Sequence, residues 1–74
     1  MEERIKQVMA DILGVDPDAI DGATSMHDIE SWDSANHISL CLGLEEAFQI
    51  QLDVSDMEAM VSYDDILHIV TSKR

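Results

Sequence analysis

The sequence predicts an all-α fold: a small bundle of four helices, three longer and one short, with a long loop between the first two. Three separate segments carry apolar residues at helical spacing. The chain has 74 residues, of which 46% are hydrophobic, so we expect residues 1–74 to form one domain around a modest core. Only Trp32, Phe48 and Tyr63 are aromatic, and the core must therefore be mainly aliphatic.

The first helix is predicted over residues 2–13. Its apolar side chains follow the i, i+3, i+4, i+7, i+8 pattern of an amphipathic helix: Ile5, Val8, Met9, Ile12 and Leu13. Gly14 fits the position just after the last turn, where glycine commonly ends a helix.

Residues 15–33 predict a long connection. They hold Pro17, Gly22 and many Asp and Ser residues, and they show no hydrophobic period. Loops of this length are usually functional. We expect five apolar side chains to pin the loop onto the core: Val15, Ile20, Met26, Ile29 and Trp32.

The second helix is predicted over residues 35–48, with Ser34 as its N-cap. At 100° per residue, one stripe contains Leu40, Leu44 and Phe48, flanked by Cys41 and Ala47, and this stripe should face the core. A short apolar link, residues 49–52, follows.

Capping-box spacing predicts the last two helices. Ser55 with Glu58 would begin a short helix at about 55–61, and Ser62 with Asp65 a final helix at about 63–71. The final helix has an apolar face formed by Ile66, Leu67, Ile69 and Val70.

The charge distribution limits the partners. The net charge is −12, and the four bases, Arg4, Lys6, Lys73 and Arg74, stand only near the two ends. Binding to phosphate needs clustered Lys and Arg, so we expect neither nucleic acid binding nor direct membrane insertion. An acidic surface instead steers the protein towards partners with basic patches, although acids can also serve solubility alone.

One cysteine, Cys41, excludes an internal disulfide. No segment reads as a signal peptide or a long apolar span. We therefore expect a cytoplasmic protein, and a monomer.

Two aliphatic residues of the second helix lie away from its core stripe. Ile38 and Leu42 share a side with Ser34 and are flanked by Ser39, Glu45 and Glu46. Apolar patches with a charged rim commonly mark partner surfaces, whereas single exposed aliphatic residues are normal. Because two lie one turn apart below the serine, we predict a partner surface.

At this point the sequence resembles the acyl carrier proteins. The matching segments are ILGVDPDAI at the end of the first helix, WDSANHI around Ser34, LGLEEAFQIQL through the end of the second helix and SYDDILHIV in the last helix. The resemblance covers essentially the whole chain. The WDS opening is similar to that of many discrete bacterial carriers.

The resemblance implies that Ser34 carries a covalent 4′-phosphopantetheine arm derived from coenzyme A, and that Asp33 is the acidic neighbour that enzymes recognise. Acyl groups would travel on the arm's thiol as thioesters. The protein would be no enzyme but the substrate of a phosphopantetheinyl transferase and of enzymes that activate, transfer or condense acyl groups, as in fatty acid or other lipid biosynthesis. The predicted partner surface then comprises Asp33, Ile38, Leu42, Glu45 and Glu46.

Three positions depart from the family pattern. Ala35 stands where Leu is usual, and Asn36 and Ser39 stand where fatty-acid carriers usually have acids. These departures indicate a specialised carrier in a lipid, envelope or secondary-metabolite pathway. His37 should line the interior near the arm, with a pH-sensitive gate as the alternative. Trp32 should plug the loop against the bundle or pack on the arm.

Other classes fit less well. A serine hydrolase would need more than His37 beside Ser34, and the chain has no G-x-S-x-G elbow. The segment DPDAIDG lacks the spacing of a calcium loop, and His37 with Cys41 gives two ligands where structural zinc needs four. We expect no metal site and no catalytic residue. The open alternative is a carrier fold that is never modified and acts as a protein-binding subunit.

Overall fold

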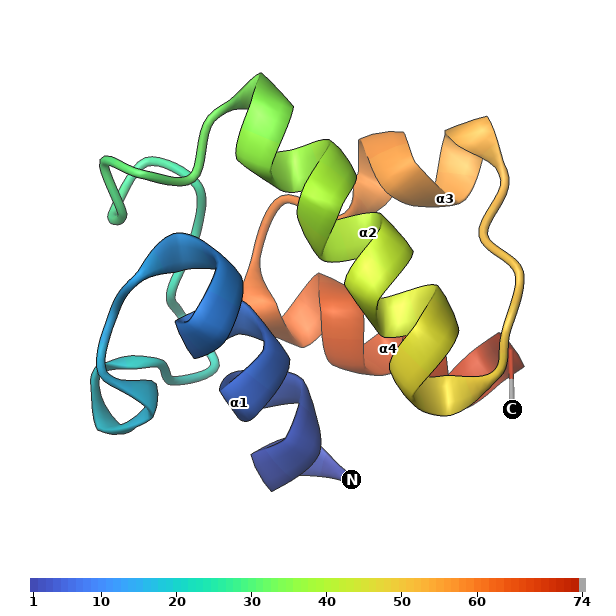
Figure 1. Ribbon diagram of the computed structural model, residues 1–74, viewed down its shortest axis with the longest axis horizontal. Helices are drawn as coiled ribbons and strands as arrows, with labels where there is room; N and C mark the ends of the chain where they lie inside the picture. The colour runs from blue at the N-terminus through green and yellow to red at the C-terminus, as the bar shows by residue number, and fades with distance from the viewer. Residues whose placement is uncertain (74) are drawn as a thin grey trace.

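The computed structural model describes residues 1–73 and confirms the predicted all-α fold (Figure 1). Its four α-helices are α1 (Glu2–Leu13), α2 (Ser34–Phe48), α3 (Val54–Ala59) and α4 (Tyr63–Lys73). A single 3-10 turn, η1 (Pro17–Ala19), lies within the long loop between α1 and α2. Arg74, the last of the four bases, lies outside the described residues.

Two glycines shape the packing of α1. Gly14 ends the helix in the left-handed conformation, at φ 71°, and its N–H donates to the Ala10 carbonyl at 2.8 Å. Gly43 lets α2 approach α1 closely, since a Cβ there would lie 2.9 Å from Cδ1 of Ile12.

The core is aliphatic, as predicted. Its fully buried side chains come from the three longer helices, from the long loop and from the residue that follows α3: Ile5, Met9, Ile20, Leu40, Cys41, Leu44, Met60, Ile66 and Val70. Phe48, Leu67 and Ile69 are partly buried against them. The apolar stripes predicted for the three longer helices are thus confirmed.

The long loop is pinned to the core by the predicted side chains. Ile20 and Trp32 are buried, and Val15, Met26 and Ile29 pack against the same core. Two backbone hydrogen bonds also tie the loop to the start of α4: Met26 N–H donates to the Val61 carbonyl at 3.0 Å, and Tyr63 N–H donates to the Thr24 carbonyl at 2.8 Å.

The predicted cap of α2 is wrong by one residue. Asp33, with extended backbone angles, is the N-cap, and its carboxylate accepts a hydrogen bond from Asn36 N–H at 2.9 Å. Ser34 is therefore the first helical residue. Asp and Ser are both favourable N-cap residues. Asp33 is the cap here because its backbone is extended, whereas Ser34 already belongs to the helix.

The short helix α3 also begins earlier than predicted. Asp53 caps it and forms a capping box with Asp56, whereas Ser55 donates its hydroxyl hydrogen bond to Asp53. The pKa of Asp53 is lowered most by the hydrogen bond that its carboxylate accepts from Asp56 N–H, and next by the one that it accepts from the Ser55 hydroxyl. The predicted cap of α4 is confirmed, because Asp65 N–H donates to Ser62 Oγ at 3.2 Å.

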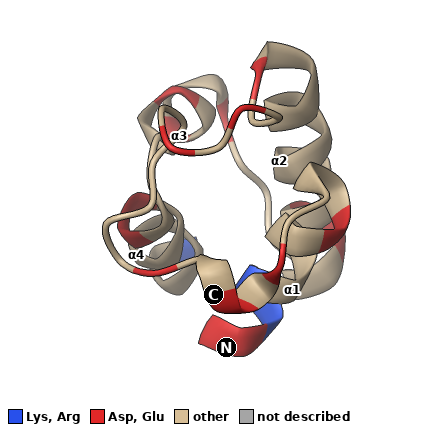
Figure 2. Ribbon diagram, turned by 90° about the vertical axis from the view of Figure 1, so that its left-hand side faces the viewer, with Lys and Arg blue, Asp and Glu red and all other residues tan. Residues whose placement is uncertain are grey.

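Figure 2 shows Lys and Arg only in α1 and α4, while Asp and Glu occur on every helix and in the loops. Lys73 pairs with Asp56 at 2.8 Å, joining the end of α4 to α3. Among residues 1–73, no helix combines the length and the apolar character needed to cross a membrane.

Candidate functional site

Ser34 stands exposed at the N-terminal end of α2, where the long loop meets the helix (Figure 1). Its hydroxyl makes no hydrogen bond with any of residues 1–73, since the capping role belongs to Asp33. A hydroxyl with no structural task in the fold can be modified without breaking a contact.

The start of α2 suits an anion attached to Ser34. No hydrogen bond within residues 1–73 engages the backbone N–H of Ser34 or Ala35, and no acidic residue occupies the first turn of the helix. Unpaired N–H groups and the positive end of the helix dipole favour a phosphate at this place. The residues present therefore fit a phosphodiester-linked group.

Asn36 braces the loop beneath the serine. Its amide Nδ2 donates to the Ser31 carbonyl at 2.7 Å, and the Ser31 hydroxyl donates to the Leu13 carbonyl at 2.6 Å. These bonds connect α2, the end of the loop and the end of α1. A carboxylate at position 36 could only accept hydrogen bonds, which explains structurally why an amide stands here instead of an acid.

His37 lies half-buried between Trp32 and α3. The Trp32 indole N–H donates to His37 Nδ1 at 2.9 Å, and His37 Nε2 lies 2.7 Å from the Met57 carbonyl. Because a carbonyl only accepts, Nε2 carries the proton and the ring is the neutral donor-acceptor form. With both ring nitrogens occupied by these partners, His37 makes no hydrogen bond to Ser34.

Trp32 is buried, with 3% of its surface exposed, and its ring stacks near His37 at a centroid distance of 6.1 Å. Trp32 therefore plugs the loop against the bundle, which is the first of the two alternatives predicted for it. Within residues 1–73, no three His, Cys, Asp or Glu side chains gather in a way that could hold a metal ion.

The outer face of α2 is arranged as the sequence predicts. Ile38 is 59% exposed and Leu42 57%, and Glu46 is exposed beside them. Glu45 is half-buried, and its Oε2 accepts a hydrogen bond from Leu52 N–H at 2.8 Å. Glu45 therefore also anchors the link to α3, a role that the sequence did not indicate.

Cys41 lies fully buried on the opposite side of α2. Burial, and secondarily the charge of Glu45, raises the pKa of its thiol. A buried, protonated thiol behaves as a small hydrophobic group, in agreement with the sequence prediction.

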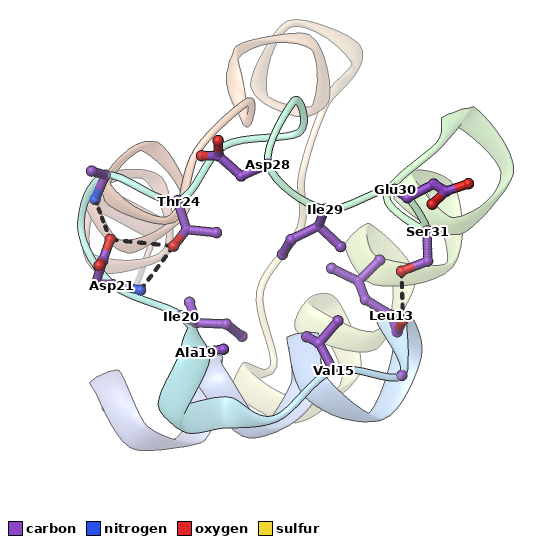
Figure 3. Close-up of a pocket in the computed structure, with 12 residues that line it drawn as sticks. Leu13, Val15, Ala19, Ile20, Asp21, Thr24, Asp28, Ile29, Glu30 and Ser31 are labelled. Atoms are coloured by element: carbon purple, nitrogen blue, oxygen red, sulfur yellow. Dashed lines mark hydrogen bonds between the residues drawn. The ribbon is translucent and has the colours of Figure 1, made fainter.

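An open cavity of about 910 Å³ lies between the end of α1 and the loop (Figure 3). Leu13, Val15, Ile20 and Ile29 supply apolar walls, and Ser31 lies at the end where the chain leads into α2. Its polar lining includes Asp21, Thr24, Asp28 and Glu30. The sequence signalled this cavity only through the loop's length and its scattered apolar residues.

Sequence reasoning also missed two exposed valines near α3. Val54 is 69% exposed and Val61 is 48% exposed. Each neighbours a residue with a capping role, Asp53 and Ser62 respectively, and only the placement of the short helix reveals their exposure.

Comparison with known families agrees with this geometry. A model of the phosphopantetheine attachment site family matches residues 3–70, which span α1 to most of α4. The family's covalent group is 4′-phosphopantetheine. The match includes the exposed serine, its capping aspartate, α2, α3 and most of α1 and α4, and confirms the resemblance to acyl carrier proteins. The chain therefore belongs to the phosphopantetheine attachment site family.

Proposed function

We propose that Ser34 is the attachment residue and that the protein carries acyl groups as thioesters on its arm. The observation that supports this most is the position of the serine. Its hydroxyl is exposed and makes no hydrogen bond within residues 1–73. The neighbouring backbone N–H groups of Ser34 and Ala35 also donate no hydrogen bond within these residues. A serine that served only as a cap would stand at the N-cap position, which Asp33 fills here.

The modification is a phosphoryl transfer carried out by a separate enzyme. The Ser34 oxygen attacks the β-phosphorus of coenzyme A and forms a phosphodiester bond. The pyrophosphate bond breaks, and adenosine 3′,5′-bisphosphate leaves. The serine proton passes to a base of the transferase, which also supplies the metal ion. This chain contributes an accessible nucleophile and N–H groups that favour the anion formed there.

Partner enzymes would dock on the face formed by Asp33, Ile38, Leu42, Glu45 and Glu46. The two apolar side chains supply contact area, and the carboxylates complement a basic patch. Tethering raises the effective concentration of a bound acyl group at each docked enzyme, so no catalytic residue is needed in the carrier itself.

The proposal includes a single-domain, monomeric carrier in the cytoplasm, acting in a specialised lipid, envelope or secondary-metabolite pathway. The bracing role of Asn36 and the presence of Ser39 leave the first turns of α2 without the acids of fatty-acid carriers. This difference would select a different set of partner enzymes.

The alternative is an unmodified carrier fold that serves as a protein-binding subunit. The lack of acids in the first turn of α2, after Ser34, favours it, because enzymes that act on the serine would find only Asp33 to recognise there.

Intact-mass spectrometry separates the two functions. The chain is incubated with coenzyme A and a broad-specificity phosphopantetheinyl transferase, beside Ser34→Ala and a known carrier as positive control. We expect a gain of one phosphopantetheine in the native chain alone. The native chain gaining no mass with this transferase or with the host's own, while the positive control is modified, would favour the unmodified protein-binding subunit over the carrier.

A further inference from the structure

We propose that His37 is a pH-sensitive positioning residue for the attachment segment, residues 31–34. Its neutral ring ties Trp32 and α3 to α2, and protonation of the ring releases Trp32. The inference rests on the proposed function, because it concerns how the segment that carries Ser34 is held for modification.

The two ring nitrogens of His37 have fixed and different roles. The Met57 carbonyl can only accept a hydrogen bond, so Nε2, which lies 2.7 Å from its oxygen, carries the ring proton. Nδ1 is then unprotonated and accepts the Trp32 indole N–H at 2.9 Å. An indole N–H can only donate. The two partners therefore cannot exchange roles, and one form of the neutral imidazole satisfies both.

Protonation of the ring breaks one of these two bonds, and it is the bond to Trp32. An imidazolium carries a proton on each nitrogen, so the bond to Met57 survives while Nδ1–H would face the indole N–H, donor against donor. Trp32 is only 3% exposed, so its indole N–H finds no water to replace the lost acceptor. The indole has to shift when the ring becomes charged.

A shift of Trp32 reaches the attachment segment directly. Trp32 is followed by Asp33 and Ser34, and it is the buried residue of this segment. Asp33 N–H donates to the Ser31 carbonyl at 3.0 Å, and the Asp33 carbonyl accepts the backbone N–H of His37 at 2.8 Å. The indole thus anchors the turn that places the cap of α2, and releasing it loosens the turn that orients Ser34.

The other titratable groups near this contact do not change charge in the range where histidine does. They come from each element that meets His37: Glu30 and Asp33 in the loop, Cys41 in α2, and Asp56 and Glu58 in α3. Carboxylates titrate near pH 4, and burial, followed by the charge of Glu45, raises the pKa of the Cys41 thiol. Histidine gains its charge between about pH 8 and 5, so a response in that range belongs to an imidazole.

The tryptophan itself reports the contact. Trp32 is the only tryptophan, so fluorescence and the indole N–H resonance both follow it alone. We expect both signals of the native protein to change as the pH falls from about 8 to about 5.5, and nitrogen shifts of His37 at the upper pH to show the proton on Nε2. His37→Gln keeps a donor and an acceptor but does not titrate, so its tryptophan signals should stay constant.

The double variant His27→Gln/His68→Gln is the matched control, because both of these histidines are exposed. It should keep the full native response. A constant tryptophan signal in the native protein, a response that persists in His37→Gln, or one that is lost in the double variant would each overturn the inference. The first and third outcomes decide the matter even if His37→Gln folds poorly.

The rate of phosphopantetheinylation tests the positioning role. The ratio of the native rate to the His37→Gln rate, taken at each pH, cancels the transferase's own pH dependence. This ratio should fall about twofold at the midpoint of the fluorescence change, where half of the molecules have released Trp32. A ratio that does not change with pH would overturn the positioning role, whereas absence of any mass gain would refute the proposed function itself. The two failures are thus distinguishable.

Discussion

Replacing His37 with Phe tests the hydrogen-bonded bridge between the loop, α2 and α3. The substitution keeps a planar ring of similar size but removes both ring nitrogens. The Trp32 indole N–H then loses its acceptor in a position where the side chain is only 3% exposed, and the Met57 carbonyl loses its donor. A buried unpaired donor costs about 1–3 kcal/mol and an ordinary hydrogen bond about 1 kcal/mol.

We therefore expect His37→Phe to lower the free energy of unfolding by about 2–3 kcal/mol. For a domain of this size, that corresponds to a fall in Tm of about 10–20 °C. Urea unfolding followed by Trp32 fluorescence and far-ultraviolet circular dichroism measures it. His68→Phe is the control, since His68 is exposed on α4 and its replacement should change the free energy by less than about 0.5 kcal/mol.

A double-mutant cycle with Trp32→Phe isolates the indole–imidazole bond. The two substitutions should be non-additive by about 1 kcal/mol, because either one alone already breaks the bond. An unfolding free energy for His37→Phe within about 0.5 kcal/mol of the native value, or strict additivity in the cycle, would refute the bridge.

Three other perturbations have defined outcomes. Ile38→Asp and Leu42→Asp should leave the helical circular dichroism unchanged but abolish acyl transfer by partner enzymes; unfolding of either variant would show that its side chain belongs to the core. Asn36→Asp should lower the free energy of unfolding by about 1–2 kcal/mol, because it loses its amide donor, and equal stability in urea to Ser39→Asp would contradict this. Asp53 has a pKa below its unfolded value of 3.8, so its stabilising effect is complete above that pH and is lost as the pH falls through the folded-state pKa. When unfolding by acid is followed by circular dichroism, the stability of Asp53→Asn, which still caps α3, should therefore depend less on pH than that of the native protein. Identical acid-unfolding curves for the two proteins would count against the capping box.

The sequence was sufficient to predict the helices and the face of α2 that meets solvent. Hydrophobic period is a local property, and Leu40, Leu44, Ile38 and Leu42 fall on the sides that it predicts. Helix starts were harder to predict, because Asp33 and Ser34 are both favourable caps and differ only in backbone conformation.

The contacts that organise the site could not be read from the sequence. His37 meets Met57 across 20 residues, and Ser31 meets Leu13 across 18. Such pairings depend on how the short helix and the loop pack, which no local pattern specifies. Ser34 was predicted as the attachment residue from the family resemblance, and the fold adds that its hydroxyl is exposed because Asp33 caps the helix.

The division of roles between Asp33 and Ser34 has a consequence for the stability of the protein after modification. Because the aspartate caps α2, esterifying the neighbouring hydroxyl removes no hydrogen bond from the fold. A phosphate at the start of the helix instead interacts favourably with its dipole, by about 0.3–1 kcal/mol. If Ser34 is the attachment residue, as proposed, the modified chain should thus resist unfolding and proteolysis at least as well as the newly made one, and the protein stays folded when the arm is added.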